Sequence, residues 1–183
     1  EMTDEERAKT WWHSARFGGG AFLDIGCYGC FFADWLLGGG EKSVFSYEAN
    51  LSTPFGDTED NFASIIRYDG KMALIEGTWT TPRAVIPSGP SVLCTEGVVT
   101  CVGGAENAPD AVCFDIYGNP VTPDEPDMQG DKYKNMPCHY AHCLKTGEPI
   151  HKMLTLEENM HVMALLDAAV KSAKERREVP ILG

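Results

Sequence analysis

One apolar stretch places the strongest constraint on how this chain folds. Residues 18–40 read GGGAFLDIGCYGCFFADWLLGGG, so a mostly apolar run lies between two glycine triplets. Glycines before a helix favour positive φ angles or close backbone approach, and glycines after it end the helix. We therefore predict a core helix over residues 20–37. Asp24 and Asp34 lie inside it, although burying an unpaired carboxylate is costly; we expect Asp34 at the surface, near the helix end.

The same stretch is too acidic to be read as a membrane span. Each charged side chain near the bilayer centre costs roughly 2.5–3.5 kcal/mol. The 183-residue chain has a net charge of −12, which disfavours anionic membranes and nucleic acid, because phosphate groups are bound by clustered Lys and Arg. With 43% apolar and 23% charged residues, the composition is that of a globular protein of about one domain.

The seven cysteines predict reduced thiols. Their odd number prevents complete internal pairing, and nothing else in the sequence suggests secretion, so we expect a cytoplasmic protein. Cys27 and Cys30 form a CxxC pair about two turns inside the predicted helix. Redox pairs of this type lie at helix N-termini, so we favour core thiols over a redox centre.

A second cluster of metal-ligating residue types lies at residues 138–143, CHYAHC. Neighbouring residues of a helix point in different directions, so Cys138, His139, His142 and Cys143 cannot all converge on one ion. We expect no metal site.

After the apolar stretch the hydrophobic period changes to two. Strands are expected at residues 44–53, 60–69, 71–81, 91–103 (a hairpin turning near Glu96-Gly97) and 111–118. Asp69-Gly70 is a hairpin signal. Residues 119–131 indicate a loop, and residues 132–147 a helix that Pro137 either kinks or begins.

The last helix is expected over residues 155–178. Thr155 and Glu158 form a capping-box pattern. The apolar stripe is expected from residues at helical spacing: Met160, Met163, Leu166 and Val170. A helix, a run of strands and then helices predict an α+β fold with an open, mainly antiparallel sheet and helices packed on one face.

Asp24 and Tyr28 are the first candidates for chemistry. At positions i and i+4 of a helix they share one face. A free phenol has a pKa of about 10, so Tyr28 would need a nearby cation to exchange protons at neutral pH. Asp24 would hold that cation or accept a hydrogen bond from a substrate. On the residues alone, a capping Asp and a packed Tyr are the favoured explanation of the pair.

The residues before the glycines are aromatic and basic. Trp12, His13 and Arg16 are candidates for binding a polar ligand, with packing at the domain edge as the alternative. The glycines themselves match neither GxGxxG nor GxxxxGK[ST], so no nucleotide-phosphate loop is predicted.

Three segments resemble one family. GGGAFLDIGCYGCFFADWLLG is similar to the GGGxLxDxGxH/Y…WLLG segment of the carboxy-terminal domain of the Gfo/Idh/MocA oxidoreductases. DNFASIIRYDGKMALIEGTWTT resembles that family's hairpin of small-residue-rich strands, and HYAHCLKTGEPI with the following helix resembles its closing helices. The resemblance covers roughly residues 12–181.

The resemblance implies a function. Such enzymes pass a hydride between NAD or NADP and a carbinol carbon of a sugar, polyol or diol, and the free face of the sheet usually forms a homo-oligomer interface. Tyr28 would take the position that is His in many members and would exchange the substrate proton. Asp24 would orient the substrate or a lysine of the nucleotide-binding domain.

The resemblance also implies a division of labour. Residues 1–183 would form a single carboxy-terminal substrate-binding and oligomerisation domain, and NAD or NADP would be bound mainly by an amino-terminal Rossmann domain that this chain does not carry. We expect the isolated chain to be inactive. The alternative is a non-catalytic assembly or ligand-binding module of the same fold.

Overall fold

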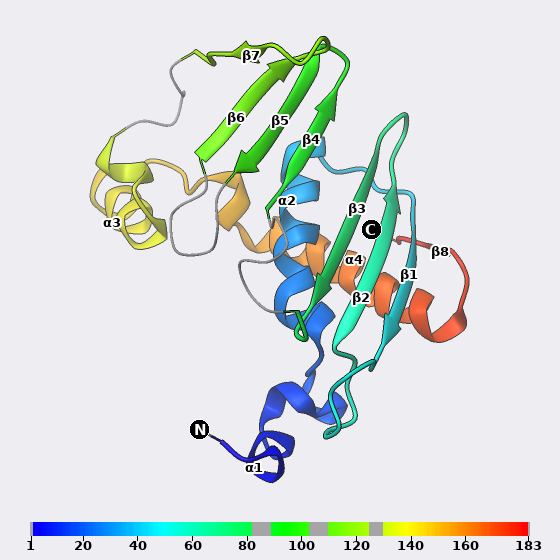
Figure 1. Cartoon of the computed structure of the whole chain (residues 1–183). Helices are drawn as coiled ribbons and strands as arrows, with labels where there is room; N and C mark the ends of the chain where they lie inside the picture. The colour runs from blue at the N-terminus through cyan, green and yellow to red at the C-terminus, as the bar shows by residue number, and fades with distance from the viewer. Residues whose placement is uncertain (1, 82–88, 103–109, 125–129, 183) are drawn as a thin grey trace. The chain divides into compact units, whose positions relative to one another are not determined.

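The chain forms two compact units. The computed structural model describes residues 2–81, 89–102, 110–124 and 130–182. One unit comprises Glu1–Thr80 with His151–Gly183, and the other Thr81–Ile150. Each contains an antiparallel sheet of four strands (Figure 1). The predicted α+β class is confirmed, but the strands divide over two sheets where we expected one. The single domain stays a prediction.

The sheet of the first unit has the strand order β3-β2-β1-β8. Its strands are β1 (Ser43–Ala49), β2 (Asn61–Arg67), β3 (Met72–Thr78) and β8 (Val179–Pro180). All neighbouring strands are antiparallel. β2 and β3 are joined by the predicted turn, in which Gly70 has a φ of +69°. A positive φ is strained for residues with a Cβ, which explains the glycine.

Two helices pack against this sheet and against each other: α2 (Cys27–Leu37) and α4 (Leu156–Glu175) (Figure 1). The core between them contains fully buried Phe22, Val44, Ile66 and Leu165. Side chains of the strands alternate between this core and the opposite face. Helices on one face and an open second face are what the sequence predicted.

The helix predicted for residues 20–37 begins with a π-helical turn, Phe22–Gly26, and continues as α2. Gly38, with a φ of +82°, ends it and donates its N–H to the Asp34 carbonyl. Residues 15–37 are long and apolar enough for a membrane span by length and composition alone. In this structure they supply Phe22 and Cys30 to the core, as core helices of the same composition do.

The last helix follows the prediction only in part. Thr155 caps α4 by accepting the Glu158 N–H. The helix ends at Glu175, three residues before the predicted end, and is capped by Arg176, which has a φ of +54°. Ser172 explains this end, because its hydroxyl donates to the Arg177 carbonyl at 2.6 Å and the chain then enters β8.

The predicted apolar stripe of α4 is wrong in two of its positions. Met160 is 60% exposed and Met163 48% exposed. The buried positions include Val162 and Leu165, at the same helical spacing but rotated around the axis. The face that meets β1 and α2 is therefore lined by branched and small residues rather than by methionines.

The second unit holds the sheet β4-β5-β6-β7. Its strands are β4 (Ser91–Cys94), β5 (Gly97–Val102), β6 (Asp110–Asp115) and β7 (Pro120–Val121). The predicted hairpin turn is confirmed, because Cys94 pairs with Gly97. β7 lies in the predicted loop, of which residues 125–129 lie outside the described ones.

The same unit includes α3 (Met136–Thr146), preceded by a 3₁₀ turn (Asp131–Tyr133). Asn135 caps α3, and Pro137 in its first turn marks its beginning rather than a kink. Gly147 ends it as predicted.

The amino-terminal residues form short helical segments. α1 (Asp4–Ala8) has a capping box between Thr3 and Glu6. Two 3₁₀ turns follow (Trp11–His13 and Ala15–Phe17), and a further one, Lys152–Leu154, precedes α4.

Candidate active site and adjoining cavity

Asp24 is held in place by a tryptophan that the sequence analysis did not single out. Trp79, which directly follows β3, donates its indole N–H to Asp24 Oδ2 at 3.1 Å. Asp24 is half-buried in the π-helical turn. Such turns expose or redirect side chains within helices and occur frequently at functional sites. The resemblance had included Trp79 in the segment EGTWTT without giving it a role.

His13 is the predicted binding residue that the structure brings to this place. Its ring lies edge-on to Trp79, with centroids 5.2 Å apart, and edge-on to Phe55 at 4.8 Å. Burial, with a smaller effect of Arg7, lowers the pKa of His13, which favours the neutral ring. Its Nδ1 is buried and has no hydrogen-bond partner among the described residues.

Tyr28, in the first turn of α2, is 74% exposed. In the described part of the chain no hydrogen bond joins its phenol to the Asp24 carboxylate. Trp12 is 41% exposed and packs on Trp11, with centroids 5.4 Å apart. The Arg16 guanidinium lies 5.6 Å from the Phe17 ring centroid. The structure thus links His13 to Asp24 through Trp79, and leaves Tyr28 accessible to a ligand.

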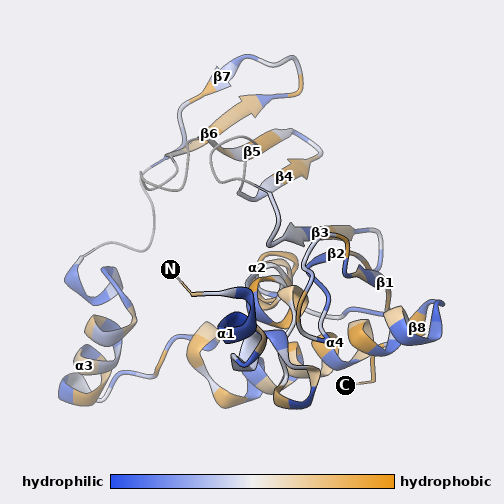
Figure 2. Cartoon of the chain, turned by 60° about the horizontal axis from the view of Figure 1, so that its bottom comes forward, coloured by the Kyte–Doolittle hydropathy of each residue, from blue (hydrophilic) through white to orange (hydrophobic). Residues whose placement is uncertain are grey.

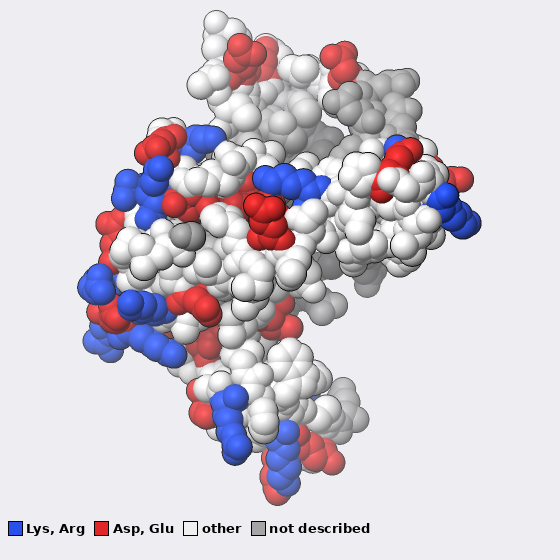
Figure 3. All heavy atoms as spheres, turned by 180° about the vertical axis from the view of Figure 1, so that it is seen from behind, with Lys and Arg blue, Asp and Glu red and all other residues white. Residues whose placement is uncertain are grey.

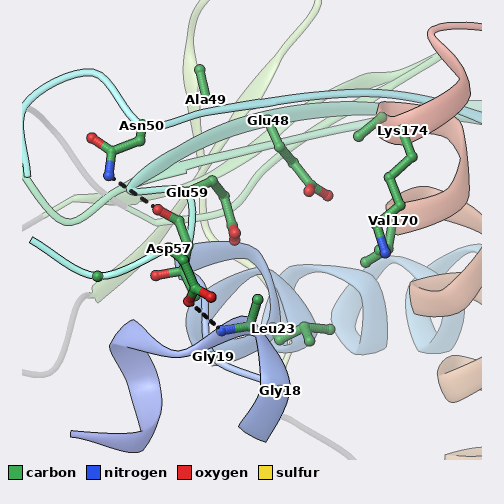
Figure 4. A pocket seen from close by; sticks show the side chains of 14 residues that line it. Gly18, Gly19, Leu23, Glu48, Ala49, Asn50, Asp57, Glu59, Val170 and Lys174 are labelled. Carbon is green, nitrogen blue, oxygen red and sulfur yellow. Dashed lines mark hydrogen bonds between the residues drawn. The ribbon is translucent and has the colours of Figure 1, made fainter. Parts of the chain in front are cut away.

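A cavity of about 590 Å³ is lined in part by the glycines that precede the apolar helix (Figure 4). Gly18, Gly19 and Leu23 form one wall, and residues 48–50, 56–59, 170, 173 and 174 contribute to the others. Glu48 of β1 and Glu59 both point into it, and Lys174 of α4 extends towards Glu48 (Figure 4).

The two glutamates of this cavity differ in their surroundings. Glu59 accepts the Phe22 N–H at 2.8 Å, at the beginning of the apolar helix. Glu48 Oε1 is buried without a hydrogen-bond partner among the described residues. Burial, and then the charge of Glu59, raise the pKa of Glu48 to about 7, and Lys174 opposes this shift. Glu48 can therefore exchange a proton near neutral pH.

The glycine triplet at 18–20 has the conformation that the sequence suggested. Gly20 has a φ of +121°, and a Cβ there would lie 2.3 Å from the Glu59 carboxylate. A Cβ at Gly19 would lie 2.4 Å from the Trp12 carbonyl oxygen. Close backbone approach, rather than phosphate binding, accounts for these glycines.

The expectation of a surface position for Asp34 is wrong. Asp34 is 1% exposed, and its Oδ1 lies 3.3 Å from His161 Nε2 of α4. The last turn of α2 faces α4 there, which the sequence of α2 alone could not reveal.

The cysteine pair Cys27 and Cys30 is confirmed as free core thiols. Cys27 is half-buried and its Sγ lies 3.4 Å from the Asp24 carbonyl oxygen. Burial raises the pKa of Cys30 to about 12, which keeps that thiol protonated. In α3, Cys143 Sγ lies 3.4 Å from His139 Nε2, and His142 Nε2 lies 3.0 Å from Glu148 Oε2.

The fold and the glycine-flanked site define a carboxy-terminal oxidoreductase domain. Residues 1–100 match the model of the GFO/IDH/MocA C-terminal domain. The chain belongs to this family, and the predicted resemblance is confirmed. No curated protein matches the chain.

Solved structures share the fold. The WlbA dehydrogenase from Bordetella pertussis, in complex with NADH and UDP-GlcNAcA, is 23% identical and has a TM-score of 0.70, over 100% of this chain and 52% of that one. An NAD binding oxidoreductase from Klebsiella pneumoniae is 17% identical with a TM-score of 0.73, over 95% and 54%.

An oxidoreductase from Agrobacterium radiobacter, in complex with NAD+, L-tartaric acid and magnesium, is 17% identical with a TM-score of 0.66, over 87% and 48% of the two chains. This chain therefore spans about half the length of the solved structures that it matches. At these identities the likeness shows the fold alone.

Proposed function

We propose that this chain is the substrate-binding and oligomerisation domain of an NAD(P)-dependent oxidoreductase that acts on a sugar, polyol or diol by hydride transfer. The observation that carries the proposal is the Asp24 carboxylate, fixed by Trp79 one turn before the exposed Tyr28 phenol. Both residues lie within the segment that matches the family.

The two side chains divide the proton chemistry. Tyr28 takes the proton of the substrate hydroxyl when the carbinol is oxidised and returns it when the carbonyl is reduced. Asp24 accepts a hydrogen bond from a second substrate hydroxyl or holds a lysine that lowers the Tyr28 pKa. The indole of Trp79 fixes the carboxylate, which reduces the entropy lost when substrate binds. We assign substrate binding to Trp12, His13 and Arg16, which the contact between His13 and Trp79 supports.

NAD or NADP, when bound, accepts or delivers the hydride. The residues of this chain fit the substrate side of that exchange, because Tyr28 is accessible and His13 is neutral and apolar in its contacts. The sequence contains no GxGxxG segment to cradle the pyrophosphate, so we assign the binding of NAD or NADP mainly to an amino-terminal Rossmann domain. The WlbA dehydrogenase complex, with NADH and UDP-GlcNAcA, supports a sugar-type substrate and an NAD-type cofactor.

Replacement of Tyr28 tests the function. In the intact oxidoreductase, Tyr28→Phe lowers kcat by about 10²-fold or more, because general acid–base catalysis contributes about 10²–10⁴. Tyr117→Phe, at a tyrosine that is 83% exposed in the other unit, is the matched control and keeps full activity. A Tyr28→Phe enzyme with unchanged kcat would remove this residue from the mechanism.

The open face of the first sheet supports assembly into a homo-oligomer. Phe45, Ile65 and Leu74 lie opposite one another on β1, β2 and β3, and are 45%, 46% and 60% exposed. In Figure 2 these strands carry both hydrophobic and hydrophilic residues, as expected where side chains alternate between two faces. Apolar side chains gathered on one face mark interaction sites. The same face favours the alternative function, a non-catalytic assembly module, which the Tyr28 experiment distinguishes.

The charge of the chain indicates the kind of partner that it binds, and its free thiols indicate the compartment in which it works. On the side seen in Figure 3, Lys and Arg are mixed with Asp and Glu. With a net charge of −12, this pattern supports a small-molecule substrate rather than nucleic acid or a membrane. All seven cysteines are free, which fits the reducing cytoplasm.

A further inference from the structure

Three metal-ligating side chains, from three different segments of the chain, converge in the first unit. Asp34 comes from the last turn of α2, Glu41 from the segment before β1, and His161 from α4. His161 Nε2 lies 2.6 Å from Glu41 Oε2 and 3.3 Å from Asp34 Oδ1. The three ligand atoms all lie within 4.8 Å of one another.

The two carboxylates of this cluster are almost completely buried, but the described residues supply few hydrogen-bond donors to them. The side chain of Glu41 is 0% exposed and that of Asp34 2%. His161 Nε2 can donate a single hydrogen bond, and the short distance assigns it to Glu41. Asp34 Oδ1 then has no donor among the described residues.

A third buried carboxylate borders this cluster. Glu158, one turn before His161 on α4, is 7% exposed. Its Oε2 pairs with Lys152 at 3.2 Å, but its Oε1 is buried and without a hydrogen-bond donor in the described part of the chain. Glu158 acts on Asp34 through the side chain and on His161 through its charge, so it adds to the negative charge around the cluster.

Asp34 lies among acidic side chains. Burial, and then the neighbouring carboxyls of Glu41 and Glu158, raise the pKa of Asp34 to about 7, and His161 opposes this shift.

We propose that Asp34, Glu41 and His161 bind a divalent transition-metal ion such as Mn²⁺ or Zn²⁺. Ligand atoms at about 2.0–2.1 Å from a tetrahedral ion lie about 3.3 Å apart, which the His161–Asp34 distance already matches. The His161–Glu41 pair opens slightly when the ion replaces its hydrogen bond. An imidazole with carboxylates suits these ions.

The site has an entry path and a structural role. The side chain of His161 is 31% exposed, so an ion can reach the cluster from solvent. Once bound, the ion links three parts of the chain, namely the segment before β1 and the two helices α2 and α4. These two helices cover the sheet. The ion therefore stabilises the first unit, and its binding does not depend on catalysis.

Titration with Mn²⁺ followed by electron paramagnetic resonance tests the proposal. Mn²⁺ is the probe because the seven thiols bind this hard ion poorly. The purified protein is expected to bind about one Mn²⁺, and Asp34→Asn to weaken binding by about tenfold or more. Asp167→Asn, at an exposed acid of the same helix α4, is the matched control and binds as the original protein does.

A second measurement needs no variant. Bound Mn²⁺ broadens the NMR signals of nearby residues, so those of Gly39 and His161 are expected to vanish. Those of Gly56, in the loop at the other end of β1 from Glu41, should persist. Absence of binding of either Mn²⁺ or Zn²⁺ at millimolar concentration overturns the proposal. Equal binding by folded Asp34→Asn protein, or broadening centred elsewhere, overturns it too. Asp34→Asn protein that does not fold leaves the decision to the broadening pattern.

Discussion

Asp60 is a carboxylate whose surroundings explain its charge. It is 1% exposed and accepts the backbone N–H groups of Leu51 at 2.7 Å, Ser52 at 3.0 Å and Thr53 at 2.7 Å. Asn61 adds a side-chain donor at 2.7 Å. Burial opposes ionisation, yet these hydrogen bonds hold the pKa of Asp60 well below its usual range. The Asp60 carboxylate therefore holds the beginning of the loop between β1 and β2 in place.

Replacement of Asp60 is expected to destabilise the protein. Asp60→Asn replaces one acceptor by a donor that faces backbone N–H groups, which costs about 1–3 kcal/mol. Urea unfolding at pH 7 measures the change. Asp69→Asn, at an exposed acid that pairs with Lys42, is the control and stays within about 0.5 kcal/mol.

The same comparison has a defined pH dependence. A carboxyl whose pKa is lowered by folding contributes its full stability above the unfolded pKa of about 3.9 and loses it as the pH falls towards the folded pKa. The difference between the original protein and Asp60→Asn should therefore be constant from pH 7 to about pH 5 and shrink below about pH 4. A difference that grows on acidification would contradict the assignment.

At the scale of elements, α4 shows how packing chooses among helical faces. Met160 and Met163 have the same spacing as Val162 and Leu165, so periodicity alone permits either face. Contact with β1 and α2 selects the second. Small residues contribute to this choice, because the Ser172 hydroxyl accepts the Ser46 N–H of β1 at 2.9 Å.

Alanine substitutions on α4 should separate the two faces. Leu165 is 0% exposed, so Leu165→Ala is expected to lower the free energy of unfolding by about 2–5 kcal/mol, through lost burial and a cavity. Met163 is 48% exposed, and Met163→Ala should change it by less than about 1 kcal/mol. Chemical denaturation of both variants gives the comparison; similar losses would mean that Met163 is also buried.

At the scale of the whole molecule, the open sheet face of the first unit exposes apolar side chains, among them Phe45, Ile65 and Leu74. Its apolar rows cross three strands, and a solvated antiparallel sheet usually carries polar residues there. A second copy of the chain would cover this face in the proposed oligomer.

Light scattering after size-exclusion chromatography tests this assembly. Ile65→Lys places a charge in the centre of the face and should convert the oligomer to a monomer, because a buried unpaired charge is costly. Leu144→Lys, at a leucine that is 86% exposed on α3, is the control and keeps the assembly. An unchanged mass for Ile65→Lys would show that the face is not the interface.

Local signals in the sequence predicted much of the fold. The Asp69-Gly70 turn, the glycines that end α2 and α3, and the Thr155 cap each act within a few residues, so their effect can be read along the chain. The capping box of Thr3 and Glu6 is an equally local signal, and it predicts the short helix α1.

The residues of the candidate sites also fall into two groups, those whose role could be read from the sequence and those that only the structure revealed. The sequence by itself determined that Asp24 and Tyr28 belong to one apolar helical segment, and that the glycines before it allow close backbone approach. Only the tertiary structure decided that Trp79 holds Asp24, and that Asp34 is a buried neighbour of His161. These partners are 55 and 127 residues away along the chain. Contacts between distant residues depend on how elements pack, and spacing along the chain does not encode that.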